Sequence, residues 1–96
     1  MVVDLRSAQI LVRAIVVQQQ MVIGPLAIAQ ANKVTGLSVS NDLKQIQVNG
    51  NPTSILSDLV NQYKTLFGQA SVEACKESVR QVMSEIKQEE IPAFLK

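Results

Sequence analysis

The chain has 96 residues, of which 47% are hydrophobic, and nine basic against eight acidic side chains leave a net charge of +1. These values predict a single folded domain over residues 1–96, exclude a disordered chain, and leave no basic field that would attract nucleic acid. Because the chain has no histidine and only one cysteine, Cys75, we expect no metal site, no cofactor and no catalytic residue.

The first residues lack the features of a signal peptide, which begins with a basic segment, an apolar run and a small-residue cleavage site. Residues 10–31 form the most apolar window, but Arg13 and the glutamines at 18–20 interrupt it. A membrane-spanning helix needs about 20 mainly apolar residues. The sequence therefore predicts a cytoplasmic protein that does not enter the membrane.

The first predicted helix begins near Leu5, with Asp4 as its N-cap. Residues 10–17 are apolar nearly all round the helix except at Arg13, and such a helix is normally buried on several sides. Because a chain of this length covers such a helix poorly, we expect a homodimer. Its candidate interface residues are Ile10, Val12, Arg13, Val16 and Val17. Arg13 has two open interpretations: its side chain extends to solvent at an edge, or it pairs with an acidic residue of the other subunit.

A second helix is predicted from Leu26 to Val34. The preceding Gly24-Pro25 pair should break the first helix, because proline lacks an N–H group and its ring clashes with the preceding turn. Thr35-Gly36 should end the second helix. Residues 5–35 thus form a first helix–Gly–helix unit.

Residues 36–51 connect this unit to the next. Apolar residues alternate with polar ones at 37–39 and 46–48, which predicts a short β-hairpin or a single strand at about 37–48. Residues 31–43 also have a superficial likeness to a helix-turn-helix motif. This likeness keeps open a weak DNA-binding regulator as an alternative function, although the would-be recognition segment at 38–44 offers only Lys44 to phosphates and Asp42 opposes it.

A second unit is predicted at about 52–89. Asn51 and Pro52 should start a helix that runs to Phe67, and a fourth helix should cover 69–89. Gly68-Gln69 between them is either a tight turn or nearly continuous helix, since no proline follows the glycine. The carboxylates of Glu73 and Glu77 lie one turn apart near basic residues, which indicates surface ion pairs rather than acid–base chemistry.

Cys75 lies on the apolar side of this fourth helix, so we expect a buried structural thiol; a redox sensor is the alternative. A short apolar tail at 90–96 follows the helix. Its residues either dock on their own domain or bind a groove of a partner, for which the candidates are Ile91, Phe94 and Leu95.

The two units repeat each other at a spacing of 44 residues. Three positions are identical, namely Val16/Val60, Gln18/Gln62 and Gly24/Gly68. The repeat predicts two related units that close on one another. One hypothesis is that Gln18 and Gln62 form a hydrogen bond between them.

The segment from Val22 to Ala27, followed by an alanine-rich helix, resembles the Leu-Gly-Pro-Ile-Ala turn of small helical modules attached to bacterial signalling proteins. Leu66-Phe67-Gly68 is similar to the related half. Those modules have no established chemistry, so the resemblance implies an interaction role and transfers no catalytic residue.

The sequence thus predicts a mainly α fold, in which two pseudo-repeated helix–Gly–helix units form a small helical bundle. The predicted function is that of a protein–protein interaction or regulatory adaptor module that is not an enzyme. The DNA-binding regulator and the thiol-based redox sensor remain the alternatives.

Overall fold

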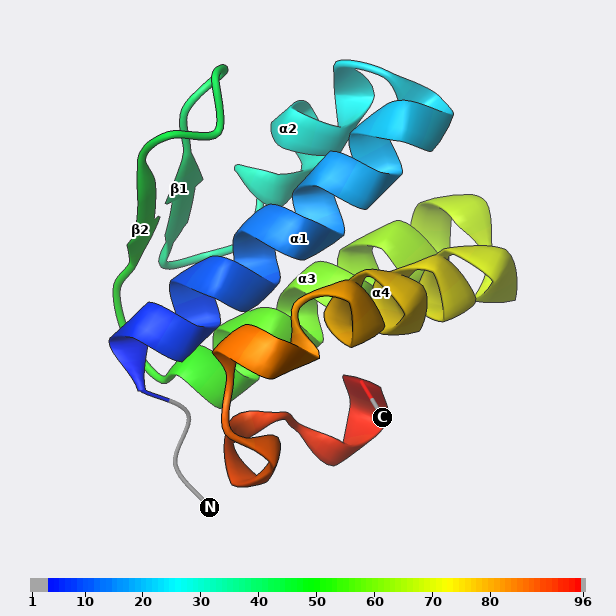
Figure 1. Ribbon diagram of the computed structural model, residues 1–96. Coiled ribbons are helices and arrows are strands. Elements are labelled where there is room, and N and C mark those ends of the chain that lie inside the picture. The colour runs from blue at the N-terminus through cyan, green and yellow to red at the C-terminus, as the bar shows by residue number, and fades with distance from the viewer. Residues whose placement is uncertain (1–3, 96) are drawn as a thin grey trace.

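The computed structural model describes residues 4–95. Among these described residues, four α-helices form the bundle: α1 (Leu5–Ile23), α2 (Leu26–Ala31), α3 (Pro52–Phe67) and α4 (Gln69–Gln81). A hairpin of β1 (Leu37–Val39) and β2 (Ile46–Val48) lies beside α1, and three short 3₁₀ turns follow α4 (Figure 1). α1 packs on α3 and α4, so the predicted mainly α fold with a short hairpin is confirmed. Within residues 4–95 no helix is both long and apolar enough to cross a membrane.

Side-chain caps start the two long helices where the sequence predicts. The carboxylate of Asp4 accepts a hydrogen bond from the N–H of Ser7 at 2.8 Å. The side-chain oxygen of Asn51 accepts one from the N–H of Ser54 at 3.1 Å, and Pro52 occupies the first helical turn. Each cap satisfies one of the N–H groups that have no partner within the helix.

Both helix pairs are broken at their glycine in the same way. Gly24 has φ 69° and ψ −147°, and Gly68 has φ 82° and ψ −171°, a region that is essentially restricted to glycine. The alternative of a nearly continuous helix through Gly68-Gln69 is therefore wrong. At Gly68 the glycine conformation ends the helix without a following proline, and we call Gly24 and Gly68 the two joints.

The repeat extends to hydrogen bonds. The N–H of Gly24 donates to the carbonyl of Gln20 at 2.9 Å, and the N–H of Gly68 donates to that of Lys64, 44 residues later, at 2.8 Å. After each joint, the N–H of the third residue donates back to the glycine carbonyl at 3.1 Å. Buried core positions also recur at this spacing, for example Leu11/Ile55, Val12/Leu56, Ile15/Leu59 and Val16/Val60.

Two reciprocal hydrogen bonds connect the units. Gln19 Nε2 donates to the carbonyl of Ser71 at 3.1 Å, and Tyr63 Oη donates to the carbonyl of Ala27 at 2.6 Å. Gln19 and Tyr63 are 44 residues apart, as are Ala27 and Ser71, so the two bonds are equivalent in the repeat. The hypothesis of a Gln18–Gln62 bond is wrong, since Gln62 donates to Gln30 at 2.8 Å.

The hairpin packs against α1 near Gln9. Its antiparallel strands pair Leu37 with Val48 and Val39 with Ile46, and these four side chains are buried. Gln9 Nε2 donates to the carbonyl of Ile46 at 2.9 Å. Because residues 37–48 form strands and a turn, the helix-turn-helix interpretation, which requires a second helix there, is wrong.

The fourth helix ends earlier than predicted, at Gln81 instead of 89. The 3₁₀ turns η1 (Met83–Glu85), η2 (Gln88–Glu90) and η3 (Ala93–Leu95) replace the rest of it. They turn the chain so that Ile86, Ile91 and Leu95 are buried. Glu90 accepts hydrogen bonds from Ser7 Oγ at 3.1 Å and from the N–H of Asp4 at 3.3 Å, which ties this segment to the start of α1.

Candidate interaction surface

The structure divides the predicted dimer residues into two groups. Val12 and Val16 are 0% exposed, because α1 packs on α3, α4 and the hairpin of its own chain. The prediction that these two residues lie in an interface between subunits is therefore corrected. Their own chain covers this face of α1. Ile10 is half-buried, while Arg13 and Val17 are exposed, and only these three remain available to another molecule.

Arg13 is exposed, and within its own chain it makes two contacts that the sequence did not predict. Its Nε donates to the backbone carbonyl of Leu43 at 2.9 Å, and a terminal guanidinium nitrogen lies 3.4 Å from the carbonyl of Lys44. Arg13 thus fastens α1 to the hairpin turn. The local sequence carries no signal for this contact, since the acceptors are backbone oxygens 30 residues away or more.

The predicted partner-binding tail docks on its own domain. Ile91 and Leu95 are each 1% exposed, so both are unavailable to a partner, and the prediction that they bind one needs correction. Phe94 is half-buried and lines a shallow groove with Val60 and Val72.

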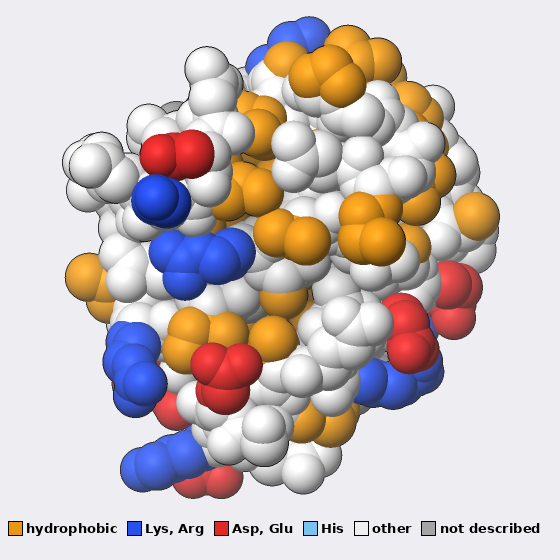
Figure 2. All heavy atoms as spheres, turned by 45° about the horizontal axis from the view of Figure 1, so that its top comes forward, with side chains coloured by type: hydrophobic (Ala, Val, Ile, Leu, Met, Phe, Trp, Pro, Cys, Tyr) orange, Lys and Arg blue, Asp and Glu red, His pale blue; other side chains and the backbone are white. Residues whose placement is uncertain are grey.

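Large apolar side chains are instead exposed around the two joints. Those preceding or following the glycines are Met21, Val22, Leu26, Leu66 and Phe67, with exposed fractions of 78%, 68%, 53%, 49% and 37%. Figure 2 shows hydrophobic side chains across the middle of one face and along its upper and right margins, with most charged groups to the left and below. Exposed apolar clusters of this kind mark interaction sites.

A groove of about 370 Å³ lies between the end of α1 and the start of α4. We call it the joint groove, and it is lined by Gln19, Val22, Ile23, Phe67, Ala70, Ser71 and Ala74. An apolar pair precedes each glycine of the repeat, Val22-Ile23 and Leu66-Phe67, and the repeat by itself predicted architecture and no exposed surface. Their exposure follows from the joints, which turn the chain away before these side chains can be covered.

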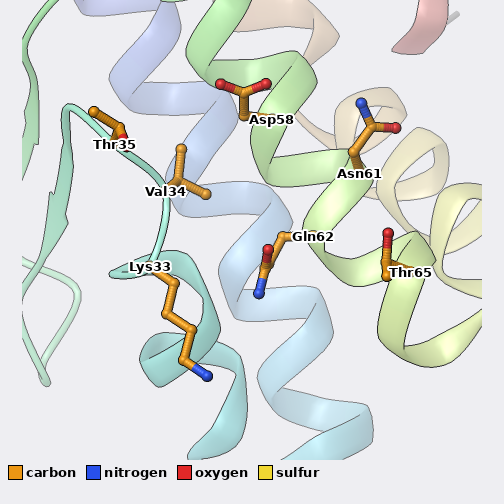
Figure 3. A pocket seen from close by; sticks show the side chains of 7 residues that line it. All are labelled: Lys33, Val34, Thr35, Asp58, Asn61, Gln62 and Thr65. Carbon is orange, nitrogen blue, oxygen red and sulfur yellow. The ribbon is translucent and has the colours of Figure 1, made fainter.

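A second groove, of about 300 Å³, lies between the segment after α2 and the outer side of α3. Figure 3 shows its polar side chains spread along α3, with Lys33 directed away from Asp58. Ligand sites instead have polar groups that converge on one point. We therefore assign no binding role to this groove.

The Cys75 thiol is fully buried, as the sequence predicts. Gln19 Nε2 lies 3.6 Å from its Sγ atom, and burial raises the pKa of the thiol to about 11. Because the reactive form of cysteine is the exposed thiolate, this environment disfavours the redox-sensor alternative.

Burial of Cys75 predicts a loss of stability at alkaline pH. Its pKa rises from 9.0 to about 11 on folding, so in this range the unfolded chain releases a proton that the folded chain retains. The contribution of Cys75 to folding stability is fully present below the pKa that its thiol has in the unfolded chain. Above that pKa the free energy of unfolding should fall, by about 2 kcal/mol at pH 11. Denaturant unfolding should show a smaller fall for Cys75→Ala. Burial also raises the pKa of Tyr63, and this second contribution is present in both proteins. An equal fall in both would therefore assign the whole loss to groups other than Cys75 and contradict this prediction.

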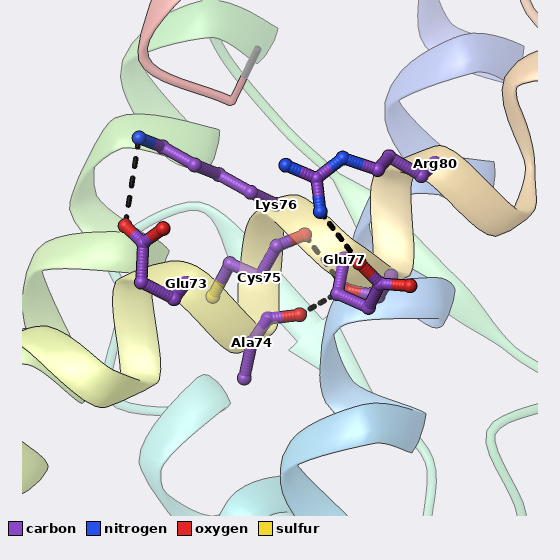
Figure 4. Close-up of polar contacts among 7 residues, drawn as sticks. Glu73, Ala74, Cys75, Lys76, Glu77 and Arg80 are labelled. Atoms are coloured by element: carbon purple, nitrogen blue, oxygen red, sulfur yellow. Dashed lines mark hydrogen bonds and ion pairs between the residues drawn. The ribbon is translucent and has the colours of Figure 1, made fainter.

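The carboxylates of α4 form surface ion pairs, as predicted. Lys76 Nζ lies 3.6 Å from Glu73, and Arg80 pairs with Glu77 (Figure 4). Such exposed pairs contribute about 0–1 kcal/mol each, so they mark a solvated surface of α4.

Within residues 4–95 no group of three or more His, Cys, Asp or Glu side chains is arranged to hold a metal ion. Comparison of the chain with protein-family models, curated proteins and solved structures returned no match.

Proposed function

We propose that this chain is a cytoplasmic protein–protein interaction module without catalytic activity, and that its joint groove binds the apolar side of a helix from a partner protein. The observation that carries this proposal is the exposure of Val22 and Phe67, which both line that groove. A helix bound in a groove presents apolar side chains at three- and four-residue spacing, and this groove offers an apolar lining between two helix ends.

The charge of the lining favours an apolar helix over other partners. Residues 14–32 and 65–72, which supply most of the surface around the groove, contain no charged side chain. An apolar partner surface can therefore bind without burying an unpaired charge, which would be costly. A nucleic acid would find no phosphate-binding groups in this lining.

The resemblance of Val22–Ala27 to the Leu-Gly-Pro-Ile-Ala turn of bacterial signalling modules supports an interaction role, with regulation or assembly as its purpose. The buried free thiol of Cys75 is consistent with a reducing compartment. We also propose the homodimer that the sequence predicts, through the side of α1 that its own chain leaves uncovered.

A photo-cross-linking amino acid tests the groove directly. Placed at Val22 in cells, it should form an adduct with one partner protein, and mass spectrometry should locate the adduct on the apolar side of a helix in that partner. Placed at Glu77 on the charged surface of α4, it should not capture the same protein.

With the purified partner, Phe67→Ala should weaken the complex by about tenfold or more, because large aromatic side chains at the centre of an interface dominate affinity. Calorimetric titration measures the change, and Glu77→Gln serves as a surface control with unchanged affinity. Adducts at both positions or at neither, or an unchanged affinity for Phe67→Ala, would contradict the proposed function.

A further inference from the structure

An apolar row, half-buried at its first two residues and exposed at its last two, runs along α1 on the side opposite the buried residues of the helix. It consists of Ile10, Ala14, Val17 and Met21, which we call the α1 stripe. The spacing of four, three and four residues places them on one line of a helix. Beside the stripe, Gln81, Val82 and Glu85 complete a groove of about 300 Å³. This groove is distinct from the joint groove, with which it shares no lining residue.

Opposite charges lie on the two sides of the stripe. At about 100° per residue, Arg13 lies to one side of the stripe, and its hydrogen bonds to the carbonyls of Leu43 and Lys44 hold it on the hairpin side. Glu85 belongs to η1, which follows α4 on the other side, and both residues line the same groove. Among residues 4–95 neither forms an ion pair, whereas Glu73 and Glu77 do.

This arrangement is complementary to itself. In a two-fold symmetric dimer the same patch packs on its own copy, so each contact occurs twice. If the two α1 helices run in the same direction about an axis parallel to them, the Arg13 side of one copy faces the Glu85 side of the other. An antiparallel arrangement would instead place the two Arg13 sides together. The charges therefore select the parallel arrangement.

We propose that a second copy of this chain covers the α1 stripe, with Arg13 of each copy paired to Glu85 of the other. The uncharged stripe would lie at the centre of the interface and the two ion pairs at its rim, which is the usual anatomy of such contacts. A standard interface covers about 800 Å² per partner, against a total surface of 5292 Å². The stripe runs over residues 10–21 of the 19-residue α1, and its two flanks widen the surface available for contact.

Charge reversal tests the pairing, with sedimentation velocity as the measurement. The native chain should be dimeric at about 100 μM. Arg13→Glu alone places acidic groups opposite each other, Glu85→Arg alone places basic groups opposite each other, and each variant should dissociate at least about tenfold more readily. Glu77→Arg, an equal change of charge away from the stripe, should remain dimeric. Circular dichroism and thermal unfolding verify that each variant is folded.

Mixing the two single variants provides the decisive measurement. In the mixed dimer the glutamate introduced by Arg13→Glu in one chain faces the arginine introduced by Glu85→Arg in the other, which forms one rim pair. The unchanged Arg13 and Glu85 face each other at the second rim, so the mixture should recover the dimer. This recovery cannot arise from a change within one chain. A monomeric native protein, single variants that still dimerise, or a mixture that stays monomeric would each overturn the proposal.

The joint groove separates this result from the proposed function. Val22→Asp should abolish capture of the helical partner and leave the dimer unchanged, whereas Val17→Glu should do the reverse. Loss of the dimer with Val22→Asp would contradict the placement of the interface on the α1 stripe.

Discussion

Replacing Leu95 with alanine should lower the free energy of unfolding by about 2–5 kcal/mol. Leu95 is 1% exposed and belongs to η3, which contacts α4. Removing its side chain leaves a cavity that the surrounding atoms fill only in part, in addition to the lost burial of apolar surface. Because domains of this size are stable by about 5–15 kcal/mol, a large part of the total stability depends on this residue.

Denaturant unfolding measures the effect, and Lys87→Ala serves as a control because Lys87 is an exposed residue of the same segment. The control should differ from the native chain by less than about 0.5 kcal/mol. If Leu95→Ala instead kept native stability and lost binding of a partner, the C-terminal segment would be a recognition peptide and its docking on the domain would be wrong.

Local signals explain why part of the fold could be predicted from sequence. The starts of α1 and α3 depend on Asp4 and Asn51, which bond to N–H groups three residues ahead. The hairpin strands depend on the alternation of buried and exposed residues, which is also local. Such features act within a few residues and need no knowledge of the rest of the chain.

The end of α4 could not be predicted in this way. Residues 82–89 are compatible with a helix, and the next proline after the start of α4 comes only at Pro92. The turns η1 and η2 form because they bring Ile86 and Ile91 into the core and Glu90 to Ser7. These contacts span most of the chain and leave no mark in the local sequence, so tertiary packing overrides the helical periodicity.

The same limit applies to the candidate surface. The apolar run at 10–17 indicates that α1 is buried on several sides, but periodicity alone does not say which sides its own chain covers. Packing of α1 on α3, α4 and the hairpin buries Val12 and Val16 and leaves Val17 exposed. Only the three-dimensional arrangement distinguishes these valines, and it moves the proposed interface to the opposite side of the helix.

Gly24→Ala and Gly68→Ala should each lower the free energy of unfolding by about 1–3 kcal/mol. A β-carbon at either position would meet no atom within 4 Å, so the loss arises from backbone conformation rather than from a collision. Both glycines combine a positive φ with ψ values of −147° and −171°, where L-residues are strained. Pro25→Ala is the matched control, because its φ of −63° and ψ of −15° suit most residues.

A D-alanine at position 24, introduced by chemical synthesis, separates strain from every other effect of the added methyl group. For a D-residue, φ 69° and ψ −147° are the mirror image of polyproline II geometry, which is relaxed. D-Alanine should therefore match or exceed glycine in stability, since it also restricts the unfolded chain, whereas L-alanine destabilises. Equal losses for both alanines would show that the joint does not need this conformation. Recovery with D-alanine alone would establish that backbone geometry is the reason glycine stands at this joint, and would predict the same result at position 68.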